Sequence, residues 1–126
     1  MIGYVTLGTN NLEKAVFFYD ELLAELNAKR FMEVEDHFIA WSVNSESPAI
    51  LITKPFDGNK ATIGNGMMVA LAVDSPKKVD SFYNKAIELG GTDEGNPGLR
   101  RNGAFYVAYF RDLDGNKLNV FCVIKK

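Results

Sequence analysis

The spacing of apolar residues changes from stretch to stretch along the chain, and it predicts strands and helices in a regular order. Segments of five to seven residues alternate between apolar and polar positions or form short runs rich in aromatic and β-branched side chains, as half-buried strands do. The predicted strands are residues 4–8, 30–35, 37–43, 49–53, 67–73, 105–110 and 118–123.

Two segments have the spacing of an amphipathic helix instead. The first begins at Leu12 after Asn10 and Asn11, either of which can cap a helix through its side-chain oxygen. The second begins after Ser75, a capping residue, with Pro76 in the first helical position. Its apolar residues end at residues 90–91, a Gly-Gly pair that can adopt the left-handed conformation of a helix end.

The remaining segments have the composition of loops and turns. Residues 54–66 (KPFDGNKATIGNG) are rich in Gly, Pro and Asn and predict a long connecting loop. Residues 92–102 predict a loop or a weak strand. Residues 114–116 (DGN) predict a hairpin turn, and the flanking Arg111 and Lys117 are expected to form ion pairs that stabilise it.

The order of elements repeats in the two halves of the chain. A shift of 64 residues aligns 4–8 with 68–72, and a shift of 68 aligns 40–41 with 108–109 and Leu51 with Asn119. Each half reads β-α-β-β-β, and such a repeat indicates two similar modules that together bury a core.

The predicted fold is therefore α+β, with two β-α-β-β-β modules pairing into a curved mixed sheet around a central cavity. We expect one domain over residues 1–126, with module 1 at about 1–56, a linking loop at about 57–66 and module 2 at about 67–126.

Composition narrows the classes of partner. The net charge is −2, which gives no electrostatic reason to expect nucleic acid or an anionic membrane as a partner. No apolar run approaches the roughly 20 residues that span a bilayer, and the chain opens without a signal-peptide pattern. Cys122 is the only cysteine, so we expect no internal disulfide and a cytoplasmic location.

Several side chains are candidates for function, and each has a plainer reading. Four aromatic residues could line a ligand pocket or simply fill the core: Tyr4, Trp41, Tyr106 and Tyr109. Arg100 and Arg101 could bind a carboxylate or phosphate, although loop arginines are more often solvated. His37, the only imidazole, is a weak candidate for acid–base catalysis. The favoured interpretation is a partly exposed residue at a strand edge. Cys122 reads as an inert core residue.

The two modules and three local motifs together resemble the vicinal oxygen chelate superfamily, which includes glyoxalase I, bleomycin-resistance proteins and extradiol dioxygenases. The motifs are KPFDG at 54–58 with GNGM at 64–67, GG at 90–91 with GNPG at 95–98, and FY at 105–106 with RDLDGNK at 111–117. The resemblance covers essentially the whole chain, but one fold hosts many chemistries.

The resemblance also assigns positions to a metal site. Enzymes of the superfamily hold a divalent ion with His, Gln or Glu from the first and last strands of each module. The matching positions here are Tyr4, Leu51, Met68 and Asn119, none of which is a suitable ligand for Zn²⁺, Ni²⁺, Fe²⁺ or Mn²⁺. We therefore expect no metal cofactor.

These positions also locate the expected ligand. Trp41, Tyr106 and Tyr109 should border the cavity, and Tyr4, Met68 and Asn119 should form its floor. Together with Arg100 and Arg101, these are the predicted ligand-binding residues.

Three functions remain open. The first is a protein that binds a small organic molecule without a metal and without catalysing a reaction. The absence of a suitable metal ligand at all four family positions favours it. The second is a lactoylglutathione lyase-like enzyme with an atypical metal site or with acid–base residues. The third is a related protein that acts through protein–protein contacts. We also expect a homodimer, the usual state of this fold.

Overall fold

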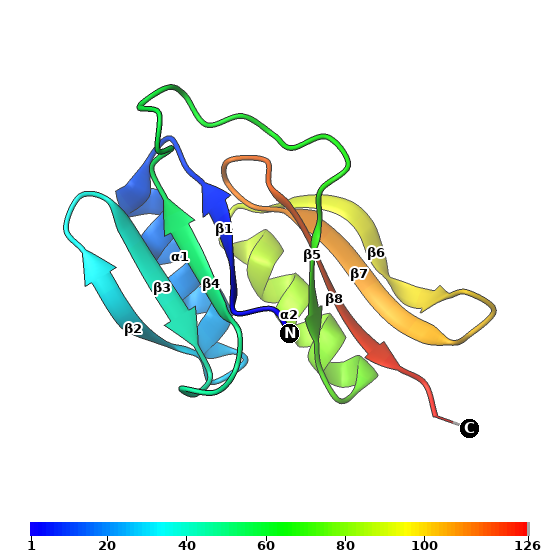
Figure 1. Cartoon of the computed structure of the whole chain (residues 1–126). Coiled ribbons are helices and arrows are strands. Elements are labelled where there is room, and N and C mark those ends of the chain that lie inside the picture. Colours follow the sequence, from blue (N-terminus) through cyan, green and yellow to red (C-terminus); the bar gives the residue numbers. More distant parts are fainter. Residues whose placement is uncertain (126) are drawn as a thin grey trace. The chain divides into compact units, whose positions relative to one another are not determined.

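Each half of the chain folds into one β-α-β-β-β unit with its own four-stranded mixed sheet and one helix (Figure 1). The computed structural model describes residues 1–125, and the two units are Met1–Ile63 (unit 1) and Gly64–Lys126 (unit 2). Unit 1 contains β1 (Tyr4–Gly8), α1 (Leu12–Ala24), β2 (Lys29–Val34), β3 (Phe38–Ser42) and β4 (Ala49–Thr53). Unit 2 contains β5 (Val69–Ala72), α2 (Pro76–Glu88), β6 (Thr92–Arg100), β7 (Phe105–Arg111) and β8 (Lys117–Val123). The predicted α+β fold with a repeated module is confirmed.

The two sheets have the same topology. The strand order is β1-β4-β3-β2 in unit 1 and β5-β8-β7-β6 in unit 2. In each, the first and last strands of the unit pair in parallel, and the other neighbours pair antiparallel. The helix between the first two strands supplies the long crossover that a parallel pair requires.

The predicted capping residues begin both helices. Asn11 caps α1 by accepting a hydrogen bond from the Lys14 amide at 3.1 Å, and Ser75 caps α2 in the same way through Lys78 at 3.2 Å. Gly90 follows α2 with a φ of 105°, the left-handed conformation that only glycine adopts without strain. Neither helix, nor any other in residues 1–125, is long and apolar enough to cross a membrane.

One face of each helix is buried against its own sheet. The buried residues of α1 are Ala15, Phe18, Tyr19, Leu22 and Leu23, and those of α2 are Val79, Phe82, Tyr83 and Ala86. Because residues alternate along a strand, this contact divides each sheet into a helix-facing side and a helix-free face.

The strand pairing corrects one detail of the predicted repeat. Leu51 pairs with Ala40, and Asn119 pairs with Tyr109. Leu51 and Asn119 differ by 68 residues, so Ala40 is equivalent to Tyr109 at a shift of 69. The predicted equivalence of Trp41 with Tyr109 is therefore wrong by one residue, and a slip of one residue places a side chain on the opposite face of the sheet.

Residues 92–102, predicted as a loop or a weak strand, form mostly strand. The nine-residue β6 pairs with β7 in spite of two glycines and a proline, and its register shifts between Asp93 and Gly95 and again between Gly95 and Gly98. These irregularities explain why the composition of β6 looks like that of a loop.

A charged cluster ties α1 to the sheet of unit 1. Arg30 on β2 donates two hydrogen bonds to the carboxylate of Asp20 on α1 and a third to Glu33, and the Trp41 indole donates to Asp20 at 2.8 Å. Hydrogen bonding from Arg30 lowers the pKa of Asp20 below its ordinary value of 3.8, and the bond from Trp41 adds to this against an opposing effect of burial.

We predict that this cluster makes stability depend on acid pH. Because the pKa of Asp20 is lowered in the folded state, its contribution is complete above the ordinary value and is lost as the pH falls through the lowered one. Between about pH 5 and pH 2 the free energy of unfolding, measured by urea titration, should fall less in Asp20→Asn than in the parent protein. Glu21→Gln, a neighbouring exposed carboxylate, should keep the steep fall; an unchanged pH dependence in Asp20→Asn would contradict the prediction.

Strand β2 lies at the edge of its sheet and is exposed along its whole length, including the apolar side chains of Phe31, Met32 and Val34. Exposed apolar edges favour self-association. We therefore keep the prediction of a homodimer and expect sedimentation to show one at tens of micromolar (roughly the range of weak dimers). Met32→Lys should shift the equilibrium toward monomer; a parent protein that sediments as a monomer there would contradict this.

Candidate functional site

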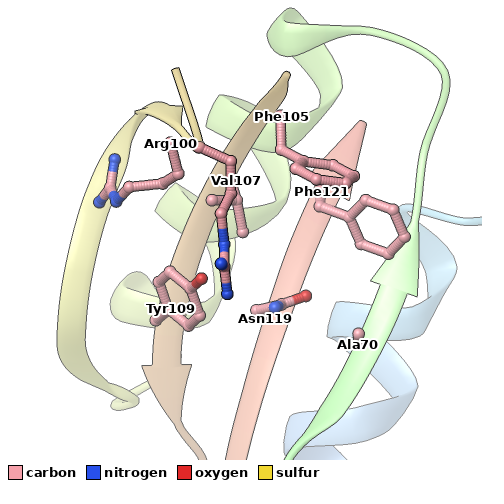
Figure 2. Close-up of a pocket in the computed structure, with 8 residues that line it drawn as sticks. Ala70, Arg100, Phe105, Val107, Tyr109, Asn119 and Phe121 are labelled. Carbon is pink, nitrogen blue, oxygen red and sulfur yellow. The ribbon is translucent and has the colours of Figure 1, made fainter. Parts of the chain in front are cut away.

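The candidate site is a pocket of about 220 Å³ on the helix-free face of the sheet in unit 2. Figure 2 shows the labelled side chains projecting from adjacent strands, with α2 behind the sheet. The lining residues are Ala70, Arg100, Arg101, Phe105, Val107, Tyr109, Asn119 and Phe121. Ligand pockets are commonly about 300–1,000 Å³, so this one suits a small molecule.

The register of the sheet places these side chains together. Tyr109 pairs with Asn119, and Val107 pairs with Phe121 across β7 and β8. Ala70 of β5 pairs with Asn119 from the other side, and a residue without a bulky side chain there leaves space beside the amide. Paired residues point to the same face of a sheet, so one face collects the lining residues of β5, β7 and β8.

Asn119 is the buried polar group of the pocket. It keeps only 6% of its surface exposed, and its Nδ2 atom donates to the Met68 sulfur at 3.7 Å. Its Oδ1 atom is buried and has no hydrogen-bond partner in residues 1–125. An unpaired buried acceptor is destabilising by about 1–3 kcal/mol, so a partner outside the chain is a physical expectation at this atom.

The aromatic ring of Tyr109 lines the pocket, and two cationic side chains lie close to it. The Arg100 guanidinium carbon lies 6.0 Å from the ring centroid, and the Lys117 ammonium lies 5.4 Å from it. Lys117 forms no ion pair within residues 1–125, so the prediction that it pairs across the hairpin turn is wrong. Arg111 does form an ion pair, but with Glu94 on β6, and it also donates to the Gly115 carbonyl at 2.9 Å.

The irregular strand β6 makes room for two side chains of the pocket. A Cβ atom at Gly95 would lie 2.9 Å from the Tyr109 ring, and a Cβ atom at Gly98 would lie 2.9 Å from Nη1 of Arg100. The two glycines therefore leave room for the ring and for the guanidinium. Arg100 is fixed there because it donates to the carbonyl of Asn96 at 2.9 Å.

Helix α2 holds this part of β6 from behind. The Tyr83 hydroxyl donates to Asp93 Oδ1 at 2.7 Å and lies 3.0 Å from Asn96 Oδ1. Burial, together with the bond to Asp93, raises the pKa of Tyr83 to about 12, so the hydroxyl stays a hydrogen-bond donor at neutral pH. The backbone that positions Arg100 is thus anchored to the helix.

Five of the predicted ligand-binding residues meet in unit 2. Arg100, Arg101, Tyr109 and Asn119 line the pocket, and Met68 contacts Asn119. Tyr106 does not join them, because it lies three residues from Tyr109 along β7 and so points to the opposite face. Its hydroxyl donates to Asp80 of α2 at 2.7 Å, and this bond raises its pKa.

The predicted residues of unit 1 are divided in the same way. Trp41 points to the helix-facing side, where its indole bonds Asp20, so it does not lie on the helix-free face as the pocket prediction required. Tyr4 and Leu51 lie on the helix-free face of unit 1, since Leu51 pairs with Thr6, the residue two after Tyr4. His37 lies exposed in the turn before β3.

Cys122, predicted as inert core, is buried on the helix-facing side, and burial raises the pKa of its thiol. A protonated thiol away from the pocket is a poor nucleophile. This placement agrees with the reading of Cys122 as part of the core.

Four lining residues were missed by sequence reasoning, namely Ala70, Phe105, Val107 and Phe121. Alternation from Tyr109 and Asn119 would have found the last three, since all lie an even number of positions away on the same strands. Phe105 and Phe121 meet edge to face with ring centroids 6.1 Å apart.

A second hollow, in unit 1, has different chemistry. It encloses about 350 Å³ between α1 and β2 and is lined by Leu12, Glu13, Val16, Phe17, Asp20, Arg30 and Asp36. Two of its charged residues, Asp20 and Arg30, already form an ion pair with each other. The pocket in unit 2 is therefore the better candidate for a ligand.

The residues at the family's metal positions do not fit a divalent metal. Leu51 has no donor atom, the Met68 sulfur is soft and accepts from Asn119, and Tyr4 and Asn119 offer only neutral oxygens. Within residues 1–125, no three side chains of His, Cys, Asp or Glu converge as ligands.

Comparisons with known proteins agree with this architecture. A curated relative from Synechocystis sp., named a probable lactoylglutathione lyase, is 26% identical over 93% of this chain and 91% of its own length. A glyoxalase/bleomycin resistance protein from Albidiferax ferrireducens T118 is 35% identical, with a TM-score of 0.87 over 98% of this chain and 99% of that one.

A more distant likeness extends only to the fold. The lactoylglutathione lyase of Agrobacterium tumefaciens is 18% identical, with a TM-score of 0.70 over 97% of this chain and 92% of that one.

The model of the Glyoxalase/Bleomycin resistance protein/Dioxygenase superfamily matches residues 1–120, which is nearly the whole sequence. With the repeated β-α-β-β-β unit, this match establishes that the chain belongs to that superfamily.

Proposed function

We propose that the protein binds a small organic molecule in the pocket of unit 2, without a catalytic metal. The observation that carries the proposal is the Oδ1 atom of Asn119, which is buried beside the pocket and has no partner in residues 1–125. A ligand with an O–H or N–H group would satisfy it. Apolar walls with a few fixed polar groups are the usual composition of a small-molecule site.

The side chains of the pocket favour binding over chemistry. None of the lining residues carries an imidazole, thiol or carboxylate, the groups that most often transfer protons or attack substrates. His37 is exposed in unit 1, and the Cys122 thiol is buried on the other side of the sheet. The groups that remain can orient and hold a ligand.

A second candidate function is that of a lactoylglutathione lyase-like enzyme. The relative from Synechocystis, similar over almost its full length, supports it. Such an activity would need an atypical metal site or acid–base residues other than those that line the pocket. The unsuitable donors at the family's metal positions make this the weaker candidate.

The binding function can be tested with naphthol, a neutral planar probe with one hydroxyl donor. We expect Asn119→Leu to weaken naphthol binding about tenfold, since the acceptor is lost. The free energy of unfolding should not fall, because a similar-sized apolar side chain replaces an unpaired polar one. Titration followed by protein NMR gives the affinity, and chemical denaturation gives the stability.

Two tyrosine variants provide a matched control for the face of the sheet. Tyr109→Leu should weaken naphthol binding about fivefold through the loss of ring contacts. Tyr106→Phe should lower the free energy of unfolding by about 1 kcal/mol through the lost bond to Asp80, with naphthol affinity unchanged. Equal weakening by both variants, or no shift of pocket resonances in the parent protein, would refute the site.

The metal-free state has its own test. Purified protein should contain no stoichiometric Zn²⁺ or Ni²⁺ by elemental analysis, and a chelator should change neither its melting temperature nor its naphthol affinity. Added Zn²⁺ or Ni²⁺ should not produce lactoylglutathione lyase activity, because the donor set cannot hold the ion. Tight metal whose removal abolishes such activity would instead establish the enzyme.

A further inference from the structure

The pocket concentrates positive charge that the chain does not neutralise. Arg100 and Arg101 line it, and Lys117 lies against the Tyr109 ring. Within residues 1–125 none of the three forms an ion pair with a carboxylate, whereas Arg111 nearby is paired with Glu94. The chain as a whole has a net charge of −2, so this local excess is opposite in sign to the whole.

Arg100 is held in place before any ligand arrives. Its Nη2 atom donates to the Asn96 carbonyl at 2.9 Å and its Nη1 atom to the Leu99 carbonyl at 3.3 Å, while the missing side chain of Gly98 makes room for it. A guanidinium has five N–H donors, so others remain for a ligand. A prepositioned guanidinium loses little freedom on binding and matches the planar geometry of a carboxylate.

The rest of the pocket suits a flat apolar body. Phe105, Val107 and Phe121 form a continuous apolar wall, and Tyr109 offers a ring. Asn119 Oδ1 requires a hydrogen-bond donor on the same ligand. The small volume, about 220 Å³, limits the body to about the size of a small aromatic ring system.

From this arrangement we infer that the ligand is a small aromatic carboxylic acid, bound as its anion, that carries a hydroxyl or amino donor. The inference rests on the proposed function of the same pocket. Arg100 and Arg101 bind the carboxylate. The apolar wall and Tyr109 contact the aromatic ring of the ligand, and Asn119 accepts a hydrogen bond from its donor group.

Matched probes test the charge. The acids are hydroxynaphthoates that carry the carboxylate on one ring and the hydroxyl on the other; the neutral partners are the corresponding carboxamides, and naphthol is the parent compound. We expect at least one acid to bind about tenfold more tightly than its carboxamide and than naphthol. The methoxy analogue of that acid should bind about tenfold more weakly, because it has no donor for Asn119.

Variants assign the effect to residues. Arg100→Gln and Arg101→Gln should each remove most of the preference for the acid over its carboxamide. Gly98→Ala should reduce the preference too, because its Cβ atom would displace the Arg100 guanidinium. Lys77→Gln, which removes the charge of an exposed residue of α2, should leave the preference intact and so controls for net charge.

The outcomes separate the two proposals. If naphthol binds in the pocket but the carboxamides bind as well as the acids, the inferred ligand class is wrong and the binding function stands. If neither acids nor neutral probes shift the pocket resonances, both proposals are refuted. If the acids are preferred but Lys77→Gln reduces the preference as much as the arginine variants, general charge attraction explains the effect and the inference fails.

Discussion

The packing of α2 against alternate residues of β7 and β8 is the constraint on which the site depends. Phe82 of the helix meets Phe110 of β7 with ring centroids 6.0 Å apart, and Leu118 and Val120 of β8 are fully buried on the same side. Once these residues face the helix, every intervening residue must face the other way. For this reason Tyr109, Asn119 and the apolar wall of Phe105, Val107 and Phe121 face the pocket.

The same topology carries different helix–sheet contacts in the two units. Trp41 of β3 is equivalent to Phe110 of β7, but its indole also donates to Asp20, which Arg30 holds in the ionised form. In unit 2 the phenylalanine cannot donate, and tyrosine hydroxyls make the polar contacts between helix and sheet instead. A common arrangement of strands thus leaves the polar interactions of each module free to differ.

The elements were largely predictable because their signals are local. Caps at Asn11 and Ser75, the glycine after α2 and the alternation of β7 and β8 each need only a few neighbouring residues. Strand β6 was harder to predict, because it forms by pairing with β7. That pairing includes two register shifts that cannot be predicted from the composition of β6 alone.

The site was predicted only in part for a related reason. Arg100, Arg101, Tyr109 and Asn119 were identified as residues, but the face that each aromatic side chain takes depends on register across the sheet. A shift of one residue in the repeat placed Trp41 with Tyr109, and grouping by residue type placed Tyr106 there too. The bend of Arg100 over Gly98 and the missing partner of Asn119 are three-dimensional facts with no local signal in the sequence.

The unpaired amide of Asn119 shows how stability and binding oppose each other in this pocket. A hydrophobic residue there would complete the apolar face that Val107, Phe121 and Ala70 begin, and it would remove a buried acceptor that destabilises the unliganded protein. Sequences depart from such local rules mainly where a function requires it. The neighbouring cations follow the same logic. Arg100 and Lys117 lie by the Tyr109 ring and Arg101 lines the same pocket, and like charges gathered there repel each other until an anion binds. Both features destabilise the empty pocket and favour the same kind of occupant, one that combines a donor with a negative charge.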